Sequence, residues 1–374
     1  MTTGSFDADL LIAGGGPVGL VAALYAAGAG LSVILCDPRA PSLDSVASAD
    51  SVDSVDKACG EGLMPAAVEA LADLEVDPAG HELIGIRYLS GDRYATGRFR
   101  DGPGRGVQRT ALHDALLRRV RAVGMDVRRE AVASVDQDDD GVTVQCVRPG
   151  GRPGSRLRAR YLLAADGLHS PLRRELGLDR GTVGARRYGL RQHVAVPSWT
   201  DCVEVYWSRC SEAYVTPVGP DCVNVAVLSS ERASLTTQLE AFPVLLRRLR
   251  GADRAHRGVD RVLGAGPLRQ RSRRRVSGRV LLVGDASGYV DALTGEGISL
   301  GIAQARKAVA AVTADRPQRY ETDWRRVTWR PSGLTHTLLL ASRVPPLRRA
   351  IVPAAVAAPR LFAAVVNAAA RPGG

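Results

Sequence analysis

The first residues in this chain whose types and spacing can do chemistry form a glycine-rich turn. The turn has the pattern G-x-G-x-x-G and contains Gly14, Gly16, Pro17 and Gly19. It follows an apolar run that predicts a buried strand, 9–13, and precedes a helical stripe of small apolar residues. In such a unit the glycines let the backbone approach a pyrophosphate, and the helix N-terminus faces its negative charge. This context favours dinucleotide binding over a structural glycine turn.

An acidic residue after the next apolar run supports the same interpretation. Asp37 closes the strand that we expect at 31–36. A carboxylate at this position can accept hydrogen bonds from an adenosine ribose. We therefore expect Asp37, and with it Arg39, to bind the adenosine end of the ligand.

Two later apolar runs also end in an acidic residue. The runs at 161–165 and 280–283 predict parallel strands, and an acid at the end of such a strand points into the ligand crevice. The alternative is that the aspartates after these strands, Asp166 and Asp285, only cap helices. That alternative explains one aspartate at a strand end more easily than two. These two segments and the helix expected from 298 to about 314 supply six more candidate binding positions: Asp166, Gly284, Asp285, Gly295, Gly297 and Ile298.

With these motifs, the sequence resembles the FAD-dependent oxidoreductases of the para-hydroxybenzoate hydroxylase type, which include aromatic monooxygenases and geranylgeranyl reductases. The motifs are GGGPVG at 14–19, ADGLHSPLRRELG at 165–177, VGDASGYVDALTGEGI at 283–298, and Arg109 within GVQRTALHDAL at 106–116. The resemblance implies an α/β protein: a Rossmann-like FAD-binding domain with an inserted antiparallel β-sheet substrate domain and a helical C-terminal region.

The resemblance also implies roles for single residues toward FAD. Arg109 would reach the pyrophosphate beside the glycine turn, Val132 would meet the adenine through its backbone, and Asp285 would bind the ribityl chain. The helix that begins near Gly297 would offer free N–H groups to the isoalloxazine. Because the chain has no second G-x-G-x-x-G unit, we expect NAD(P)H to bind only transiently as the reductant, unless another reductase supplies the electrons.

The segment 57–65, KACGEGLMP, resembles the Cys-Gly loop of geranylgeranyl reductase-like flavoproteins, which lies beside the flavin ring. The alternative is a loop that leads into a helix at 66–74. Cys59 is a candidate reactive thiol, although no sequence feature indicates a lowered pKa. His193 and Tyr214, on strands of the expected substrate sheet, are candidates to face the substrate and to accept a proton. Each is also a plausible packing residue.

The expected organisation has three parts. They are a FAD-binding domain (1–80, 105–180 and 276–315), a substrate domain of alternating strands (81–104 and 181–275) and a helical C-terminal region (316–374). Helix breaks are expected in this last region at Pro331, Pro345, Pro346, Pro353 and Pro359. The region is apolar enough to pack over the substrate domain or to touch a membrane surface.

Composition narrows the class of protein. The net charge is +11, but the basic residues are scattered and aromatic residues make up only 5%, so we expect no nucleic-acid partner. The six cysteines form no CxxC pair and no zinc-like cluster, which indicates a reduced protein without a bound metal. No basic residue precedes the first apolar run, so the N-terminus does not resemble a signal peptide. We expect a cytoplasmic location.

Three functions fit these observations. The leading one is a monooxygenase that uses FAD, NAD(P)H and molecular oxygen to hydroxylate or oxidise a phenolic or polyketide-type small molecule, through a flavin C4a-hydroperoxide as the resemblance implies. The alternative is an FAD-dependent reductase of isoprenoid, geranylgeranyl-type double bonds, which the Cys-Gly loop favours. The third is a protein that binds flavin, or an anionic surface through its basic charge, without catalysis.

Overall fold

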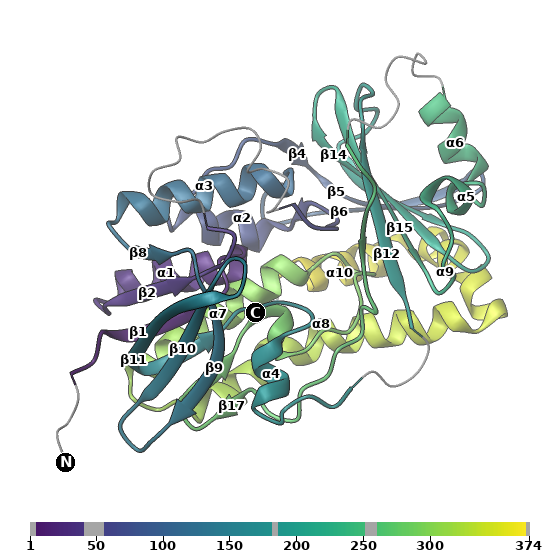
Figure 1. The fold of residues 1–374 in the computed structure, drawn as a ribbon. Coiled ribbons are helices and arrows are strands. Elements are labelled where there is room, and N and C mark those ends of the chain that lie inside the picture. Colours follow the sequence, from purple (N-terminus) through teal and green to yellow (C-terminus); the bar gives the residue numbers. More distant parts are fainter. Residues whose placement is uncertain (1–4, 41–55, 182–185, 251–259, 372–374) are drawn as a thin grey trace.

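The computed structural model describes residues 5–40, 56–181, 186–250 and 260–371. Parts of the expected segments 1–80, 181–275 and 316–374 therefore lie outside the described residues. Figure 1 shows a unit built on β1, β2 and β11 beside a second unit built on β12, β14 and β15, with the C-terminal helices in yellow along the second unit. The mixed α/β architecture with a helical C-terminal region confirms the fold class expected from the sequence.

The first sheet has eight strands, in the order β17-β18-β11-β1-β2-β8, with β10 and β9 continuing from β11. Its strands are β1 (Ala8–Ala13), β2 (Val33–Cys36), β8 (Asp126–Arg128), β9 (Ala131–Gln137), β10 (Val142–Arg148), β11 (Arg152–Ala164), β17 (Val276–Ser277) and β18 (Val280–Leu282). The strands from β18 through β8 pair in parallel. The acids that follow β2, β11 and β18 therefore lie at one edge of the sheet.

Helices cover this sheet with apolar side chains. They are α1 (Pro17–Gly28), α2 (Pro65–Ala72), α3 (Arg109–Ala122) and α7 (Gly297–Thr313), with the short α4 (Pro171–Glu175) after β11. A Cβ atom at Gly301 of α7 would lie 2.4 Å from the side chain of Val18 in α1. The close contact between these two helices thus depends on glycine. The helices expected at 66–74 and 298–314 are observed with ends that differ by one or two residues.

The second sheet has seven strands in the order β16-β12-β15-β14-β13-β5-β6. They are β5 (Gly85–Ser90), β6 (Arg93–Arg98), β12 (Tyr188–Val194), β13 (Cys202–Trp207), β14 (Glu212–Gly219), β15 (Cys222–Ser229) and β16 (Leu263–Ala265). Most pairs are antiparallel as expected, but β13 pairs with β5 in parallel. These two strands come from distant parts of the chain, so no hairpin turn imposes an antiparallel register.

Both faces of the second sheet are covered by helices. All six residues of β13 are buried. Residues of the C-terminal helices, including Phe362 and Val366, pack on one face with Val203 and Val205. On the other face, side chains from α5 (Leu235–Leu239) and α6 (Pro243–Arg250) complete a second apolar cluster. A third, small sheet has three strands in the order β3-β7-β4. They are β3 (Gly62–Leu63), β7 (Gly104–Gly106) and β4 (His81–Leu83).

The C-terminal region folds as α8 (Arg319–Arg343), α9 (Pro345–Ala357) and α10 (Pro359–Ala370). The prediction of helix breaks at Pro331 and Pro353 is wrong, because α8 and α9 continue through them. Pro331 is buried, and its packing outweighs the intrinsic cost of a proline inside a helix. Pro345 and Pro359 open helices, where a missing N–H costs nothing.

Among the described residues, no single helix is both long and apolar enough to cross a bilayer. Helices α9 and α10 reach the required length and hydropathy only as a pair, and they meet at an angle of 106°.

Candidate functional site

The turn between β1 and α1 can be built only with glycine. Gly14 has a φ of +108°, and a Cβ atom there would lie 2.5 Å from the carbonyl oxygen of Ala165. A Cβ at Gly19 would lie 1.9 Å from the carbonyl oxygen of Gly14. The first contact brings the turn against the end of β11, and the second lets α1 approach it closely. The backbone of the turn is therefore open to a ligand at the N-terminus of α1.

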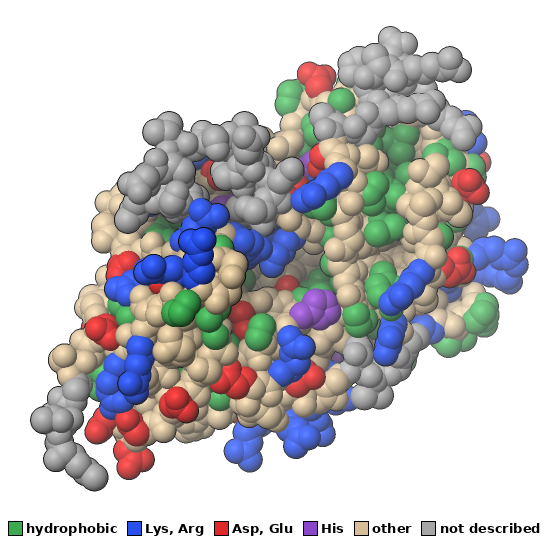
Figure 2. Space-filling model, in the orientation of Figure 1, with side chains coloured by type: hydrophobic (Ala, Val, Ile, Leu, Met, Phe, Trp, Pro, Cys, Tyr) green, Lys and Arg blue, Asp and Glu red, His purple; other side chains and the backbone are tan. Residues whose placement is uncertain are grey.

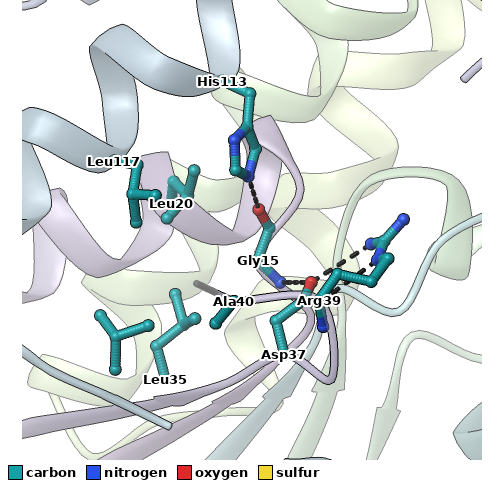
Figure 3. Close-up of a pocket in the computed structure, with 9 residues that line it drawn as sticks. Gly15, Leu20, Leu35, Asp37, Arg39, Ala40, His113 and Leu117 are labelled. Carbon is teal, nitrogen blue, oxygen red and sulfur yellow. Dashed lines mark hydrogen bonds and ion pairs between the residues drawn. The ribbon is translucent and has the colours of Figure 1, made fainter. Parts of the chain in front are cut away.

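Asp37 holds this turn in place. Its carboxylate accepts hydrogen bonds from the backbone N–H of Gly15 at 2.6 Å and of Arg39 at 2.7 Å, and it pairs with the Arg39 guanidinium (Figure 3). Burial raises the pKa of Asp37, but the bonds and charge of Arg39 outweigh that effect and leave the pKa below its usual value. Asp37 is therefore an anion at the end of β2, as a ribose-binding acid must be.

His113 is a contributor that sequence reasoning missed. Its Nε2 atom lies 3.0 Å from the carbonyl oxygen of Gly15, which can only accept, so Nε2 carries a proton (Figure 3). Burial, and then the charge of Arg109, lower the pKa of His113 and favour the neutral ring. The signal was present in the sequence, because Arg109 and His113 are four residues apart and lie on one face of α3.

Cations converge on the glycine turn. The position of a Cβ at Gly16 lies 3.7 Å from Nη2 of Arg109, and the Nε atom of Arg109 is buried without a hydrogen-bond partner. Burial lowers the pKa of Lys57, and the neighbouring charges of Arg39 and Arg109 lower it further. Three cations beside the free N-terminus of a helix fit a pyrophosphate, whose two negative charges would satisfy them. The residues present thus fit FAD at its phosphate centre.

Asp285 and Asp166 end neighbouring strands but have different surroundings. Asp285 lies in the 3-10 turn Gly284–Ser287, where burial raises its pKa and the charges of Arg109, Lys57 and Arg173 oppose that rise. Asp166 accepts a hydrogen bond from the backbone N–H of Leu172 at 3.1 Å, in the first turn of α4, whose N-cap is Ser170, while its other oxygen has no partner. Asp166 thus supports this helix N-terminus, and its contact with a cofactor stays a prediction.

Buried Arg173 joins the two acidic loops. Its guanidinium donates to the carbonyl oxygens of Leu168 and Ala286, both at 3.0 Å, and pairs with Asp179. Figure 2 shows this face of the molecule hollowed between the two units, with basic side chains at the edge of the hollow. Loops from β1, β11 and β18 thus meet at one crevice, as the three sequence motifs predicted.

The other predicted cofactor contacts come from β9 and from the segment that begins α7. Val132 is on β9, opposite Cys146 of β10, where it packs beside the end of β2. Gly295 has a φ of +68°, and a Cβ there would be 3.4 Å from Met64. Gly297 begins α7, no side chain caps that helix, and Ile298 packs partly buried behind it. Their roles toward adenine and isoalloxazine stay predictions.

The Cys-Gly loop is held by the second sheet. Asn224 donates to the carbonyl oxygen of Cys59 at 2.9 Å, and Thr216 donates to that of Gly60 at 2.8 Å. A Cβ at Gly60 would meet no atom within 4 Å, so the loop borders open space. Burial raises the pKa of Cys59, which therefore stays a thiol. The loop leads directly into α2, as the alternative interpretation expected, and its place beside the flavin ring stays a prediction.

His193 lies between two carboxylates. Its Nε2 is 2.6 Å from Oε2 of Glu61, and its Nδ1 is 2.7 Å from Oδ2 of Asp260. Burial alone would lower the pKa of His193, but the bond to Glu61 raises it above its usual value. Glu61 has a φ of +58°, and its second oxygen accepts the N–H of Arg109 at 2.7 Å. His193 therefore links β12 to the Cys-Gly loop and, through it, to α3.

Tyr214 lies elsewhere, on the wall of a large apolar pocket. The cavity has a volume of about 320 Å³ and extends from Met64, Leu293 and Gly295 to Leu361 and Val365. The described residues that line it include no aspartate, glutamate, histidine, lysine or arginine. The phenol of Tyr214 donates to the carbonyl oxygen of Leu293 at 2.8 Å, and burial raises its pKa well above the usual value. Tyr214 thus lines this pocket, whereas His193 and Cys59 do not.

Sequence reasoning also missed a group of buried charges beside this pocket. Glu212 pairs with Arg187 and with Arg348, and Arg187 reaches Asp291 at 3.5 Å. Burial raises the pKa of Asp291 to about 6, and one of its oxygens has no hydrogen-bond partner. These residues come from four separate segments of the chain, so no local sequence pattern predicts the cluster.

Comparison with known proteins agrees with this geometry. The chain is 28% identical over 342 residues to digeranylgeranylglycerophospholipid reductase 1 of Methanothermobacter thermautotrophicus, covering 84% of this chain and 81% of that protein. It is 28% identical over 344 residues to rifampicin monooxygenase of Streptomyces venezuelae, covering 88% and 67%. A flavoprotein/dehydrogenase from Cytophaga hutchinsonii has the same fold, with a TM-score of 0.81 at 16% identity, covering 96% and 92%.

A family model gives the assignment. The model described as FAD binding domain matches residues 94–315, more than half of the chain. That range includes Arg109, Asp166, Asp285 and the loop before α7, which are the parts that converge on the glycine turn. This chain therefore belongs to the FAD binding domain family and is an FAD-dependent oxidoreductase.

Proposed function

We propose that this oxidoreductase reduces carbon–carbon double bonds in the hydrocarbon chain of an isoprenoid lipid. The observation that carries the proposal is the apolar pocket, which begins at Gly295 and Met64 beside the N-terminus of α7 and ends at Leu361. A cavity of this shape and lining suits a long hydrocarbon, because its walls offer aliphatic contacts and few polar partners. Relatives named as reductases of geranylgeranyl chains and of menaquinone support the same substrate class.

The chain's own residues would bind the substrate and keep water out. Ile86, Val203 and Val205 of the second sheet form one wall, and α8 to α10 form the other. Burying a hydrocarbon chain here is favoured by about 0.8 kcal/mol for each CH₂ group. FAD, once reduced by NAD(P)H or by another reductase, would supply a hydride to one carbon of the double bond. The phenol of Tyr88 or Tyr214 on the pocket wall would supply the proton to the other carbon.

The pocket also limits what the substrate can be. A phenol that must be deprotonated needs a base, and the described residues that line the pocket include no carboxylate or imidazole. Burial, followed by the charges of Glu212 and Glu296, raises the pKa of Tyr88, so its phenol is no base at neutral pH. This favours a neutral hydrocarbon over an ionised ring.

A second candidate is the monooxygenase that the sequence led us to expect. The hydroxyl groups of Tyr88 and Tyr214 on the pocket wall favour it, since they can hydrogen-bond to a phenolic ring. The relationship to rifampicin monooxygenase supports the same chemistry. In this case molecular oxygen is a second substrate, and the apolar part of the pocket takes an alkyl or polyketide chain.

One pair of experiments decides between the two reactions. In the first experiment, the reduced enzyme is mixed anaerobically with a geranylgeranyl lipid. In the second, it is mixed with an alkylated phenol under labelled oxygen gas. The masses of the products are measured by mass spectrometry. We expect a gain of two hydrogens per double bond in the first reaction and no label in the second. Label in a hydroxylated phenol, with the lipid unchanged, would contradict the reductase and establish the second candidate.

A further inference from the structure

We propose that α8, α9 and α10 form a docking surface for an anionic lipid bilayer, and that the apolar pocket opens into that surface. The inference deepens the proposed function and rests on it for the identity of the substrate. The docking surface consists of the exposed side chains between Trp329 and Val365. It would let a lipid pass from the membrane into the pocket without crossing water.

The exposure of apolar side chains is concentrated here. Of eleven large hydrophobic side chains that are exposed among the described residues, seven lie in this surface: Trp329, Leu340, Val344, Leu347, Val356, Leu361 and Val365. Leu340 is 62% exposed and Leu361 is 66% exposed. Single exposed leucines are ordinary on a protein surface, but a group of them on three consecutive helices marks an interaction site.

The exposed residues are continuous with the pocket. Leu361 and Val365 are at once exposed and part of the pocket lining, so the cavity reaches the surface at α10. On α8, the exposed Leu340 directly precedes the pocket-lining residue Ala341, at 100° around the axis by ideal helix geometry, and the exposed Val344 follows the last residue of the helix. The mouth of the pocket is therefore bordered by apolar side chains on both α8 and α10.

The charge of the segment identifies the partner as anionic. No aspartate or glutamate occurs after Asp323, while the same segment contains eight arginines: Arg325, Arg326, Arg330, Arg343, Arg348, Arg349, Arg360 and Arg371. Arg348 is buried and binds Glu212, but Arg343, Arg349 and Arg360 are exposed. Arginines beside apolar residues can extend to lipid phosphates while their stems stay in the apolar layer.

A second copy of this chain fits the surface less well. A two-fold dimer through it would place arginines opposite arginines with no acidic residue of the segment to pair with them. The angle of 106° between α9 and α10 also fits a pair of helices that lies along the membrane interface rather than across it. Apolar contact with positive charge around it is the usual composition of such interfacial helices.

The test is co-sedimentation of the FAD-bound protein with vesicles. Vesicles of phosphatidylcholine alone are compared with vesicles that also contain phosphatidylglycerol, at low and high salt. The variant is Leu340→Glu with Leu347→Glu, since neither residue lines the pocket. The matched control is Val123→Glu with Val262→Glu, which makes the same charge change at exposed valines outside the docking surface.

We expect the protein to bind the anionic vesicles, and we expect this binding to weaken with salt. The partition coefficient of the Leu340/Leu347 variant should be lower by a factor of about ten or more, and that of the control variant should be unchanged. Equal partition of both variants, or no binding to anionic vesicles, would overturn the inference. So would a stable dimer that the leucine variant converts to monomer, which would assign the surface to a second copy.

Activity separates this inference from the proposed function. Turnover of a detergent-dispersed isoprenoid lipid does not need a membrane, so the leucine variant should retain it. Vesicle binding without any lipid reduction would leave the docking surface in place and refute the proposed reaction. Reduction of the dispersed lipid without vesicle binding would support the proposed reaction and refute the docking surface.

Discussion

Single glycines decide whether the phosphate end of the crevice can form. At Gly19 an added methyl group would overlap the carbonyl oxygen of Gly14, which is backbone and cannot rotate away. At Gly28, the last residue of the same helix, an added methyl would meet no atom within 4 Å. The two positions therefore form a natural pair for comparison.

We expect Gly19→Ala to lower the free energy of unfolding by about 1–3 kcal/mol, because the turn must shift, and to reduce the FAD content of the purified protein. Gly28→Ala should leave both unchanged or raise stability by up to about 1 kcal/mol through helix propensity. Urea unfolding and the ratio of flavin to protein absorbance measure the two effects. Equal behaviour of the two variants would show that α1 does not approach the turn as described.

We expect the carboxylate of Asp285 to contribute to FAD binding rather than to folding. Because Arg109, Lys57 and Arg173 all act on its buried carboxylate, Asp285→Ala should fold but bind FAD about 10- to 100-fold more weakly, as expected for a lost hydrogen bond worth about 1.5–3 kcal/mol. The control is Asp136→Ala, at an exposed aspartate of β9. Equilibrium dialysis against FAD gives both dissociation constants. Full flavin occupancy of the Asp285 variant at low FAD would contradict its place beside the ribityl chain.

At the scale of elements, the contact between β12 and the Cys-Gly loop depends on pH. The pKa of His193 is raised in the folded chain above the ordinary 6.5. The protonated ring therefore stabilises the fold fully below about pH 6.5, and this contribution is lost as the pH rises through the raised value. The carboxylates of Glu61 and Asp260 favour a proton on each ring nitrogen, while the Arg191 guanidinium, with Nη1 at 3.0 Å from Nδ1, opposes the second positive charge.

The stability gap between the parent protein and His193→Gln should accordingly be about 2 kcal/mol near pH 6 and clearly smaller near pH 9. Urea unfolding at a series of pH values measures it. His169→Gln, at an exposed histidine, is the matched control. A gap that widens with pH would mean that the ring is neutral in the folded protein.

For the whole molecule, the pocket ties the second sheet to the C-terminal helices. Ala355 of α9 lines it, whereas Ala364 of α10 is exposed and outside it. Ala355→Phe should shorten the cavity and lower kcat/KM for a long-chain substrate by about tenfold, with little change for a short-chain one. Ala364→Phe should change neither. The same loss for both chain lengths would show that the substrate does not reach α9.

The sequence alone determined the cofactor half of this protein. The glycine turn, the acids after β2 and β18, and the Ser170 cap with Pro171 in α4 are local devices. They depend on steric limits and hydrogen bonds within a few residues, so they can be recognised from their spacing in the sequence alone. The same is true of the prolines that open α9 and α10.

Only the tertiary structure decided the rest. Glu61, His193 and Asp260 meet although 132 and 67 positions separate them, and the parallel pairing of β5 with β13 also joins distant segments. Pro331 stays inside α8 because packing outweighs its local preference. The pocket has walls from the Cys-Gly region, the second sheet, the loop before α7 and the last three helices, and such long-range packing leaves no periodic mark in the sequence. For that physical reason the motifs indicated the flavin and left the substrate open between a phenol and an isoprenoid chain, while only the folded chain supplied the apolar pocket and its exposed edge on α10.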